Sequence, residues 1–340
     1  MPKILGIDRA DRVRNHIING NFDYWQRGTI FNSIVGGYFT DRWQMVKSTV
    51  GGTVNALQST DVPTNFKSKY STEIIQKTAS TSSLTEYSIR TTFERQNARK
   101  IFNNQEATLS FWYKSNKVGN HYARLANSVG TGVTGATDAY AEFTVNSADT
   151  WEKKIITVTM NIGSFGSNSE QSFSSFVDIG FGASGGGGVG FTQVDVDDYF
   201  RLTQVMLNEG PSAAPFQTAG ANSAEELTMC QRYYEKTYSI NTNPGAATND
   251  GSIETKFTGM SSAVRQISYS WAYKVEKRAA PTVVTYGASG LSGFVQMVGG
   301  NRTPLLILNS TSSILVNATD SVSTSTGLMN FQATADAELY

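Results

Sequence analysis

Residue types that carry metal or nucleophilic chemistry are scarce in this sequence. His16 and His121 are the only histidines and Cys230 is the only cysteine, so no Cys/His ligand set for zinc can be assembled. A single cysteine also excludes an internal disulfide. A Ser-His-Asp site would need one of the two histidines, and neither has a motif around it. Because both lie in polar sequence, we expect them to be solvated rather than catalytic.

Two short motifs suggest chemistry but lack the context that the chemistry requires. Asp195, Asp197 and Asp198 could offer oxygen ligands to calcium, but they lack the loop of an EF-hand, so we interpret them as a solvated strand entry. The stretch GGGGVG at 185–190 fits the dinucleotide pattern G-x-G-x-x-G literally. That pattern requires a helix N-terminus after the glycines. The residues that follow, FTQVDVDDYF, have strand character, so we predict a flexible loop and no nucleotide.

Aromatic side chains on polar faces are the remaining candidates for a binding site. Trp112 alternates with the apolar Phe111 and Tyr113, and Tyr140 lies on the opposite side of its strand from Phe143. An aromatic ring is a good platform for the C–H face of a sugar. The alternative is that these rings pack on a neighbouring subunit or loop. We name Trp112 and Tyr140 as glycan-binding candidates, and we predict no catalytic residue, no metal site and no cofactor.

Composition and charge narrow the class of protein. The 28 Lys and Arg balance 28 Asp and Glu, so the electrostatic footprint of a nucleic-acid-binding protein is absent. Only 16% of the 340 residues are charged and 31 are glycine, which favours an all-β chain. No signal-peptide core and no run of about 18 apolar residues occurs. We therefore expect a soluble protein made in a cytoplasm, without membrane insertion.

The elements that must position these residues are mainly short strands. Residues 87–93, 109–113 and 156–160 alternate with period two, which indicates antiparallel sheets buried on one face, in a sandwich or barrel. A helix is predicted from Ser223 to about residue 238, with Ser223 and Glu226 as a capping box. The residues after 253 are again predicted to form strands. We therefore expect two β units, the second led by a helix.

The stretch INGNFDYWQRGT…YFTDRW resembles the start of a domain common in tailed-bacteriophage virion proteins, which include tail fibres and related receptor-binding or decoration proteins. Further along, ATLSFWYKSN is similar to a core strand of a carbohydrate-binding-module-like jelly roll, and TWEKKIITVTM to the strand after it. RLTQVMLNEGPSAAPFQ resembles the closing strand and exit of that domain. EELTMCQRYYEKTY and FQATADAELY are similar to the first helix and last strand of the C-terminal module. The resemblance covers nearly the whole chain in the same order.

The resemblance implies an all-β fold, in which a jelly-roll β-sandwich is followed by a helix and a second, smaller β-sandwich module. We expect an N-terminal attachment arm at 1–16, the jelly roll at 17–220 and the C-terminal module at 221–340. The resemblance also implies a homotrimer on the virion, which its N-terminal arm joins to other tail or capsid proteins. Calcium-bearing jelly rolls of this type often carry paired aspartates in the closing strand, where this chain has Thr203-Gln204, so no calcium site is carried over.

The stretch near the start of the chain is interpreted as a structural motif. We expect Phe22, Trp25 and Trp43 to be core and seam residues of the first two strands, with Arg27 and Arg42 paired to carboxylates or carbonyls there. A sugar site on one of the two tryptophans is the alternative. The full motif, called the opening motif below, comprises Asn19, Gly20, Phe22, Asp23, Trp25, Arg27, Arg42 and Trp43.

These observations together favour a non-enzymatic virion structural protein. We expect a tail-fibre or receptor-binding protein that contacts host surface glycans. A head-fibre or decoration protein of the capsid is an alternative within the same class. A tailspike-like glycan depolymerase is the alternative from another class, although the sequence shows neither a β-helix repeat nor a marked carboxylate pair.

Overall fold

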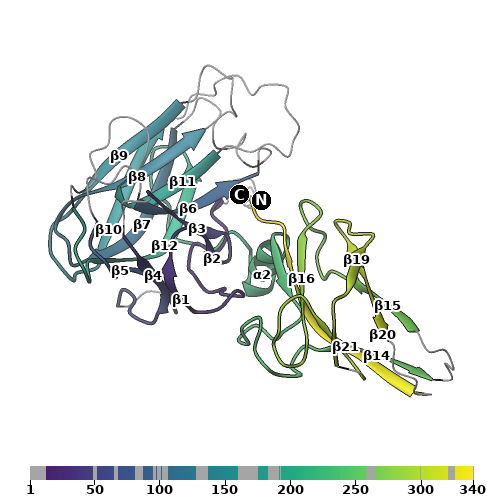
Figure 1. Cartoon of the computed structure of the whole chain (residues 1–340). Helices are drawn as coiled ribbons and strands as arrows, with labels where there is room; N and C mark the ends of the chain where they lie inside the picture. The colour runs from purple at the N-terminus through teal and green to yellow at the C-terminus, as the bar shows by residue number, and fades with distance from the viewer. Residues whose placement is uncertain are drawn as a thin grey trace, which may run out of the picture.

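The protein is described by a computed structural model, in which two β modules are joined by the helix α2 (Ser223–Gln231) (Figure 1). The first module precedes α2 in the chain and the second follows it. The residues that the structure describes are 13–48, 52–64, 68–80, 87–94, 97, 101, 106–127, 137–159, 175–182, 191, 193–258, 265–298, 300–320 and 326–339.

The first module is a sandwich of two six-stranded antiparallel sheets. Sheet I has the strand order β1 (Ile30–Ile34), β4 (Val54–Ser59), β5 (Ser71–Gln76), β12 (Tyr199–Glu209), β7 (Glu106–Ser115) and β10 (Glu152–Thr159). Sheet II has the order β2 (Gly37–Thr40), β3 (Trp43–Lys47), β6 (Tyr87–Phe93), β11 (Ser175–Gly182), β8 (Gly119–Asn127) and β9 (Thr137–Val145). The chain passes repeatedly from one sheet to the other (Figure 1), so the predicted all-β jelly-roll sandwich is confirmed.

Alternation along the strands fills the space between the two sheets. In β7, Phe111 and Tyr113 are buried, whereas Trp112 and Lys114 are partly exposed. The ring of Tyr113 stacks on Phe200 of β12 with centroids 5.5 Å apart. Because successive side chains of a strand point to opposite faces, the other set of residues forms the outer face of sheet I.

His121 lies in the core of the first module, which differs from the predicted solvated turn. The side chain is fully buried in β8. Its Nδ1 is 2.9 Å from the hydroxyl oxygen of Tyr113, and its Nε2 is 2.7 Å from the carbonyl oxygen of Lys117. Burial lowers the pKa of His121 to about 4, so the ring is neutral at pH 7. The nearby sequence is polar, but strand alternation turns this ring inward.

The second module is a smaller β-sandwich built around the long strand β21 (Thr326–Asp336). Its other strands are β13 (Tyr234–Lys236), β14 (Ile253–Thr258), β15 (Arg265–Ala272), β16 (Thr282–Tyr286), β17 (Val295–Met297), β18 (Gly300–Arg302), β19 (Leu305–Ile307) and β20 (Ser313–Asp320). β21 pairs with β13, β14, β16 and β17, while β15, β20 and β19 form a three-stranded sheet. Trp271, Val316 and Phe331 belong to the buried core of this module.

Helix α2 begins with a different cap from the predicted one. The N-cap is Asn222, whose side chain accepts hydrogen bonds from two backbone N–H groups of the first turn, each at 3.0 Å. Ser223 is not the cap, and the carboxylate of Glu226 accepts from the backbone N–H of Asn19 at 2.6 Å and from that of Gly220. The helix ends before Tyr234, which belongs to β13. No helix in the described part of the chain is long and apolar enough to span a membrane.

The chain joins the first module slightly earlier than expected. Asn15, which falls in the predicted arm, is buried. Its Nδ2 donates to the carbonyl of Val205 at 3.1 Å, and its Oδ1 accepts from the N–H of Leu207 at 3.1 Å. The end of the predicted arm is therefore part of the fold, while residues 1–12 lie outside the described part of the chain.

Candidate functional site

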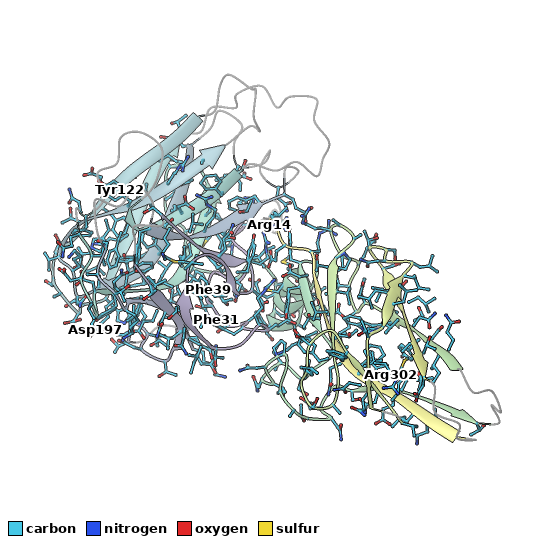
Figure 2. The ribbon with its side chains drawn as sticks, viewed as in Figure 1. Arg14, Phe31, Phe39, Tyr122, Asp197 and Arg302 are labelled. Atoms are coloured by element: carbon cyan, nitrogen blue, oxygen red, sulfur yellow. The ribbon has the colours of Figure 1, made fainter. Side chains whose placement is uncertain are left out.

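The aromatic rings of the opening motif pack inside the first module. Phe22 and Trp43 have ring centroids 5.1 Å apart, and Trp25 contacts Phe39 at 5.8 Å. Phe39 in turn contacts Phe31, at 6.4 Å (Figure 2). The tryptophans are at most 4% exposed. They offer no free ring face to a ligand, and their role is to hold the first strands in the core.

Asn19 and Gly20 form a turn that depends on their residue types. Asn19 adopts a φ of 56°, a left-handed conformation that asparagine tolerates. Its Nδ2 donates to the carbonyl of Asp41 at 2.9 Å, and its Oδ1 accepts from the N–H of Tyr24 at 3.1 Å. A Cβ on Gly20 would lie 2.1 Å from the carbonyl oxygen of Val205. Only glycine therefore allows this close approach to β12.

Asp23 lies at the rim of the opening motif. Its side chain is partly buried and accepts a hydrogen bond from Asn21 Nδ2 at 3.0 Å. Burial raises the pKa of Asp23, and the hydrogen bond from Asn21 and the charge of Lys69 oppose that effect. Asp23 thus contributes a local contact rather than an ion pair across the modules.

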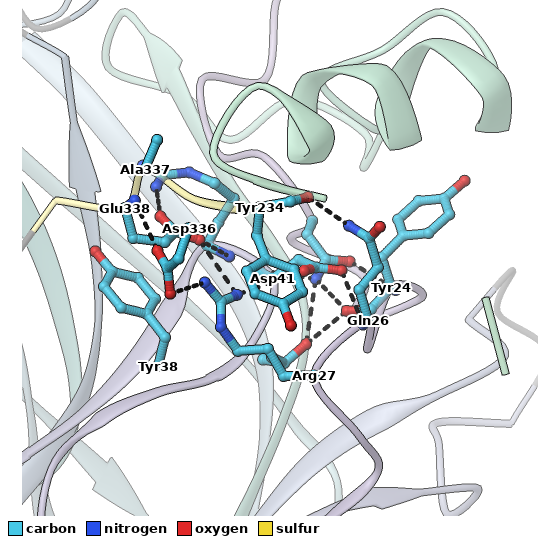
Figure 3. Close-up of polar contacts among 12 residues, drawn as sticks. Tyr24, Gln26, Arg27, Tyr38, Asp41, Tyr234, Asp336, Ala337 and Glu338 are labelled. Atoms are coloured by element: carbon cyan, nitrogen blue, oxygen red, sulfur yellow. Dashed lines mark hydrogen bonds and ion pairs between the residues drawn. The ribbon is translucent and has the colours of Figure 1, made fainter. Parts of the chain in front are cut away.

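Arg27 and Arg42 pair with carboxylates at the far end of the chain. Arg27 Nη2 is 3.0 Å from Asp336 Oδ2 (Figure 3). Arg42 Nη1 pairs with the carboxylate of Glu338. The Arg27 guanidinium also lies 3.7 Å from the ring centroid of Tyr234. The two arginine side chains are 9% and 2% exposed, so these contacts tie the second module to the first through a desolvated interface.

Asp41 adds a third carboxylate to this interface, called the junction cluster and made up of Arg27, Asp41, Arg42, Asp336 and Glu338. Asp41 is fully buried; its Oδ2 accepts from the backbone N–H of Gln26 at 3.2 Å. Its Oδ1 is 3.6 Å from Arg27 Nη1. Burial raises the pKa of Asp41 to about 6, although Arg27 and Gln26 act in the opposite direction. This carboxyl group is therefore one that titrates near neutral pH inside the interface.

The structure places the two predicted glycan-binding residues on different sheets. Trp112 lies in β7 of sheet I, in register with Lys153 of β10 and Thr203 of β12, and is partly exposed. Tyr140 lies in β9 of sheet II, in register with Arg124 of β8. The two strand positions therefore belong to different sheets of the sandwich. The structure does not bring the two residues together.

A row of charged side chains crosses the outer face of sheet I next to Trp112. Arg201 of β12 pairs in register with Glu73 of β5 and with Lys114 of β7. Arg201 Nη2 donates to Glu73 Oε1 at 2.6 Å, and Lys114 Nζ donates to Asp61 Oδ2 at 2.8 Å. Arg201 also donates to Asp61 through Nη1. The charged row, Glu73, Arg201, Lys114 and Asp61, is therefore held by its own hydrogen bonds.

Asp61 holds three side chains of this face in place. Its Oδ1 accepts from Trp151 Nε1 at 2.9 Å, while its Oδ2 accepts from Lys114 and Arg201. Burial by itself would raise the pKa of Asp61, but the hydrogen bonds from Lys114 and Trp151 and the charge of Arg201 outweigh it and lower the pKa. The carboxylate is therefore ionised at neutral pH, and both of its oxygens are occupied.

Three partly exposed aromatic residues among those described lie around the charged row: Trp112, Trp151 and Tyr199. Tyr199 stacks against Arg201, whose Cζ is 4.6 Å from the ring centroid. Together with the charged row, these residues form the aromatic face. It offers flat rings and fixed polar groups on one surface.

Sequence reasoning found only one member of the aromatic face. Tyr199 and Arg201 alternate with buried residues in β12, so period two contained a signal for them. Trp151 and Asp61 lie outside the strands and have no periodic signal. They come together with Trp112 because the order of sheet I places β5, β12, β7 and β10 side by side.

Two of the three aspartates suggested as calcium ligands pair with lysines. Asp197 is 2.9 Å from Lys77 Nζ, and Asp198 is 2.8 Å from Lys117 Nζ. Asp197 lies at the end of the sandwich remote from the second module (Figure 2). Within the described residues, no group of three or more His, Cys, Asp or Glu side chains is arranged to hold a metal ion. The glycine stretch 185–190 lies outside the described residues.

Comparison with known proteins gives structural similarity at low sequence identity. No family model and no curated protein matches the sequence. The enzymatically active domain of tailspike protein 4 of bacteriophage CBA120 is 13% identical, with a TM-score of 0.35, over 58% of this chain and 21% of that chain. The CBM22-1 xylan-binding domain of Paenibacillus barcinonensis Xyn10C is 12% identical, with a TM-score of 0.33, over 55% and 99%. The C-terminal family 22 carbohydrate-binding module of Clostridium thermocellum Xyn10B is 13% identical, with a TM-score of 0.32, over 55% and 98%.

Proposed function

We propose that this protein is a non-enzymatic structural component of a bacteriophage particle, a tail fibre or receptor-binding protein, whose aromatic face contacts glycans on the host surface. The observation that carries the proposal is the set of three partly exposed aromatic residues, Trp112, Trp151 and Tyr199, around the charged row of sheet I. Aromatic rings stack on the C–H faces of sugars, and nearby polar groups set their orientation. The sequence resemblance to tailed-phage virion proteins supports its place on a particle.

The aromatic face is organised before any ligand arrives. Asp61 holds Trp151, Lys114 and Arg201 through hydrogen bonds, and Arg201 also holds the ring of Tyr199. Side chains that are already ordered lose less conformational entropy when a ligand binds. A shallow surface of this kind can therefore bind a sugar chain without a deep cleft.

The ionisation of Asp61 favours binding over cleavage. A glycosidase needs one carboxylic acid that is protonated and can give its proton to the leaving group, and a second carboxylate opposite it. The pKa of Asp61 is lowered, and Glu73 accepts a hydrogen bond from Arg201. A tailspike-like depolymerase is the competing function. Release of reducing ends from host polysaccharide by the purified protein would establish it and overturn our proposal.

We further propose that the protein assembles as a homotrimer on the virion, attached to tail or capsid proteins through the part of the N-terminal arm that precedes Asn15. A single aromatic face would bind a sugar chain weakly, and three copies on one particle would increase the attachment through multivalency. A head-fibre or decoration protein on the capsid is the alternative position for the same chain.

Light scattering of the purified chain at two salt concentrations tests the assembly. A mass near three chains at both concentrations is expected for the fibre, because a trimer formed by buried apolar contacts is not dissociated by salt. A monomer would contradict the trimer and favour a decoration protein that assembles only on its particle.

A glycan array tests the aromatic face itself. The wild-type chain is compared with Trp112→Ala, which alters sheet I, and with Tyr140→Ala, which alters sheet II. We expect Trp112→Ala to remove most of the signal and Tyr140→Ala to retain it. The reverse result would move the glycan site to sheet II, and wild-type binding to no glycan would contradict the proposed function.

A further inference from the structure

The strand positions around Trp112 on the outer face of sheet I carry cations and no carboxylate. Lys153 and Thr203 are its partners in register. Lys114 lies two residues further along β7, and Arg201 is a diagonal neighbour on β12. Such diagonal neighbours on one face lie about 7–8 Å apart, within reach of long side chains. A sugar ring stacked on Trp112 would therefore lie beside three cationic side chains, two of which are held by the carboxylates of the charged row.

Only one of these three cations has no partner within the described part of the chain. Lys114 and Arg201 donate to the carboxylates of Asp61 and Glu73, which neutralise them. Lys153 is exposed, and it takes part in no hydrogen bond or ion pair of the described residues. Its ammonium group is thus available to a ligand, at the strand position in register with Trp112.

Building on the proposed function, we propose that the glycan bound at the aromatic face is acidic. A sugar ring stacks on Trp112, and a negatively charged substituent of the glycan, a carboxylate or a phosphate, accepts a hydrogen bond from Lys153 Nζ. A charge-assisted hydrogen bond of this kind is stronger than one between neutral groups. A neutral sugar would leave the ammonium group of Lys153 hydrogen-bonded to water only. A neutral glycan should therefore bind the aromatic face less tightly than an acidic one.

Pairs of glycans that differ only in charge test the inference on the full chain. α-1,4-Linked galacturonic acid trisaccharide is compared with α-1,4-linked galactose trisaccharide, and 6-phosphorylated maltotriose with maltotriose, within an array of further acidic and neutral pairs. We expect the acidic members to bind about three- to fivefold more tightly, the range of a partly exposed ion pair. This preference should shrink at 0.5 M salt.

Variants of single residues test whether Lys153 causes the preference for acidic glycans. Lys153→Gln should bind acidic glycans only as tightly as their neutral counterparts. Lys256→Gln, which changes an exposed strand lysine of the second module, should keep the wild-type preference. Trp112→Ala should weaken binding to both members of each pair, because it removes the ring and not the charge.

The possible outcomes separate the inference from the proposed function. Equal binding to the acidic and neutral members of every pair would overturn the inference while leaving glycan binding in place, as would a Lys153→Gln variant that keeps the preference. A wild-type chain that binds no member of the array would contradict both. A preference confined to uronic acids or to phosphorylated sugars would identify which acidic group Lys153 binds.

Discussion

The junction cluster and the aromatic face use the same residue types at very different burial. In each, an arginine pairs with carboxylates and lies against a tyrosine ring, Arg27 at 3.7 Å from Tyr234 and Arg201 at 4.6 Å from Tyr199. Among the carboxylates, the side chain of Asp41 is 0% exposed and that of Asp61 is 34% exposed. Their pKa values shift in opposite directions, because burial dominates at Asp41 and hydrogen bonds dominate at Asp61.

This difference shows how burial decides the role of an arginine–carboxylate pair. A buried pair costs desolvation energy, and removing one partner leaves a charge without water or counter-charge. A partly exposed pair contributes little to stability, but its groups can reach a ligand. The junction cluster therefore determines how the modules are held together, and the aromatic face is suited to binding. Four predictions test this contrast, the first by breaking the buried pair.

Replacement of Arg42 by alanine should have the largest effect on stability. The change removes the shorter of the two ion pairs of the buried Glu338 and leaves only Arg27 Nη1, 3.5 Å from Glu338 Oε1. We therefore expect the free energy of unfolding to fall by about 3–5 kcal/mol. Urea denaturation measures this loss. The control is Lys77→Ala, whose pair with Asp197 is exposed and should be worth about 1 kcal/mol or less. An Arg42→Ala variant as stable as this control would mean that the junction cluster does not stabilise the fold.

The pH dependence of stability should distinguish Asp41 of the junction cluster from His121 of the core. The folded-state pKa of Asp41, about 6, lies above its ordinary value of 3.8. The contribution of protonated Asp41 to the free energy of unfolding is therefore full below pH 3.8 and is lost as the pH rises through 6. The shift corresponds to about 2–3 kcal/mol. His121 acts in the opposite direction, because its lowered pKa costs stability as the pH falls from about 6.5 to about 4.

The variant Asp41→Asn isolates the junction contribution. Compared with the wild type, it should lose about 2–3 kcal/mol more stability between pH 7 and pH 4, because it lacks the group that gains protons on folding. Unfolding curves at several pH values measure the difference. Asp197→Asn, at an exposed position, serves as the control. Parallel pH profiles for Asp41→Asn and the wild type would refute the buried titration.

Gly20→Ala should test how closely the opening motif approaches β12. Its new Cβ would collide with the carbonyl of Val205, so we expect a loss of about 1–3 kcal/mol. Thermal unfolding is a sufficient measurement. Gly293→Ala is the comparison, since no atom lies within 4 Å of its Cβ position and only its backbone conformation is strained. A larger loss for Gly293→Ala would argue against the close approach.

Trp112→Ala should have the smallest effect on stability. The ring is partly exposed, so we expect a change within about 1 kcal/mol, although glycan binding is lost. Trp43→Ala, at a fully buried ring, should cost about 3–5 kcal/mol. Differential scanning calorimetry of the two variants compares them directly. A large loss for Trp112→Ala would show that its ring supports the fold and would weaken the case for the aromatic face.

Strand-level features were predictable because they depend on local chemistry. Period two in the strand that contains Phe111 and Tyr113 assigned the inward set correctly, and it left Trp112 on the outer face. Helix α2 was predicted to exist, but its end and its cap were not. Glu226 accepts from the distant Asn19 and from Gly220, which precedes the helix, and not from Ser223 as the capping box predicted. The cap falls one residue earlier than predicted because Asn222 accepts hydrogen bonds from two N–H groups of the first turn.

The sequence by itself determined the strands, the two β modules and the polar or apolar face of each strand, because alternation and turn chemistry act between near neighbours. Only the tertiary structure decided which charges meet. Arg27 and Asp336 are 309 residues apart, and Arg201 and Asp61 are 140 apart. Nothing local to an arginine specifies its carboxylate, because ion pairing depends on proximity in space. The order of strands in sheet I and the docking of the last residues on the first module create that proximity.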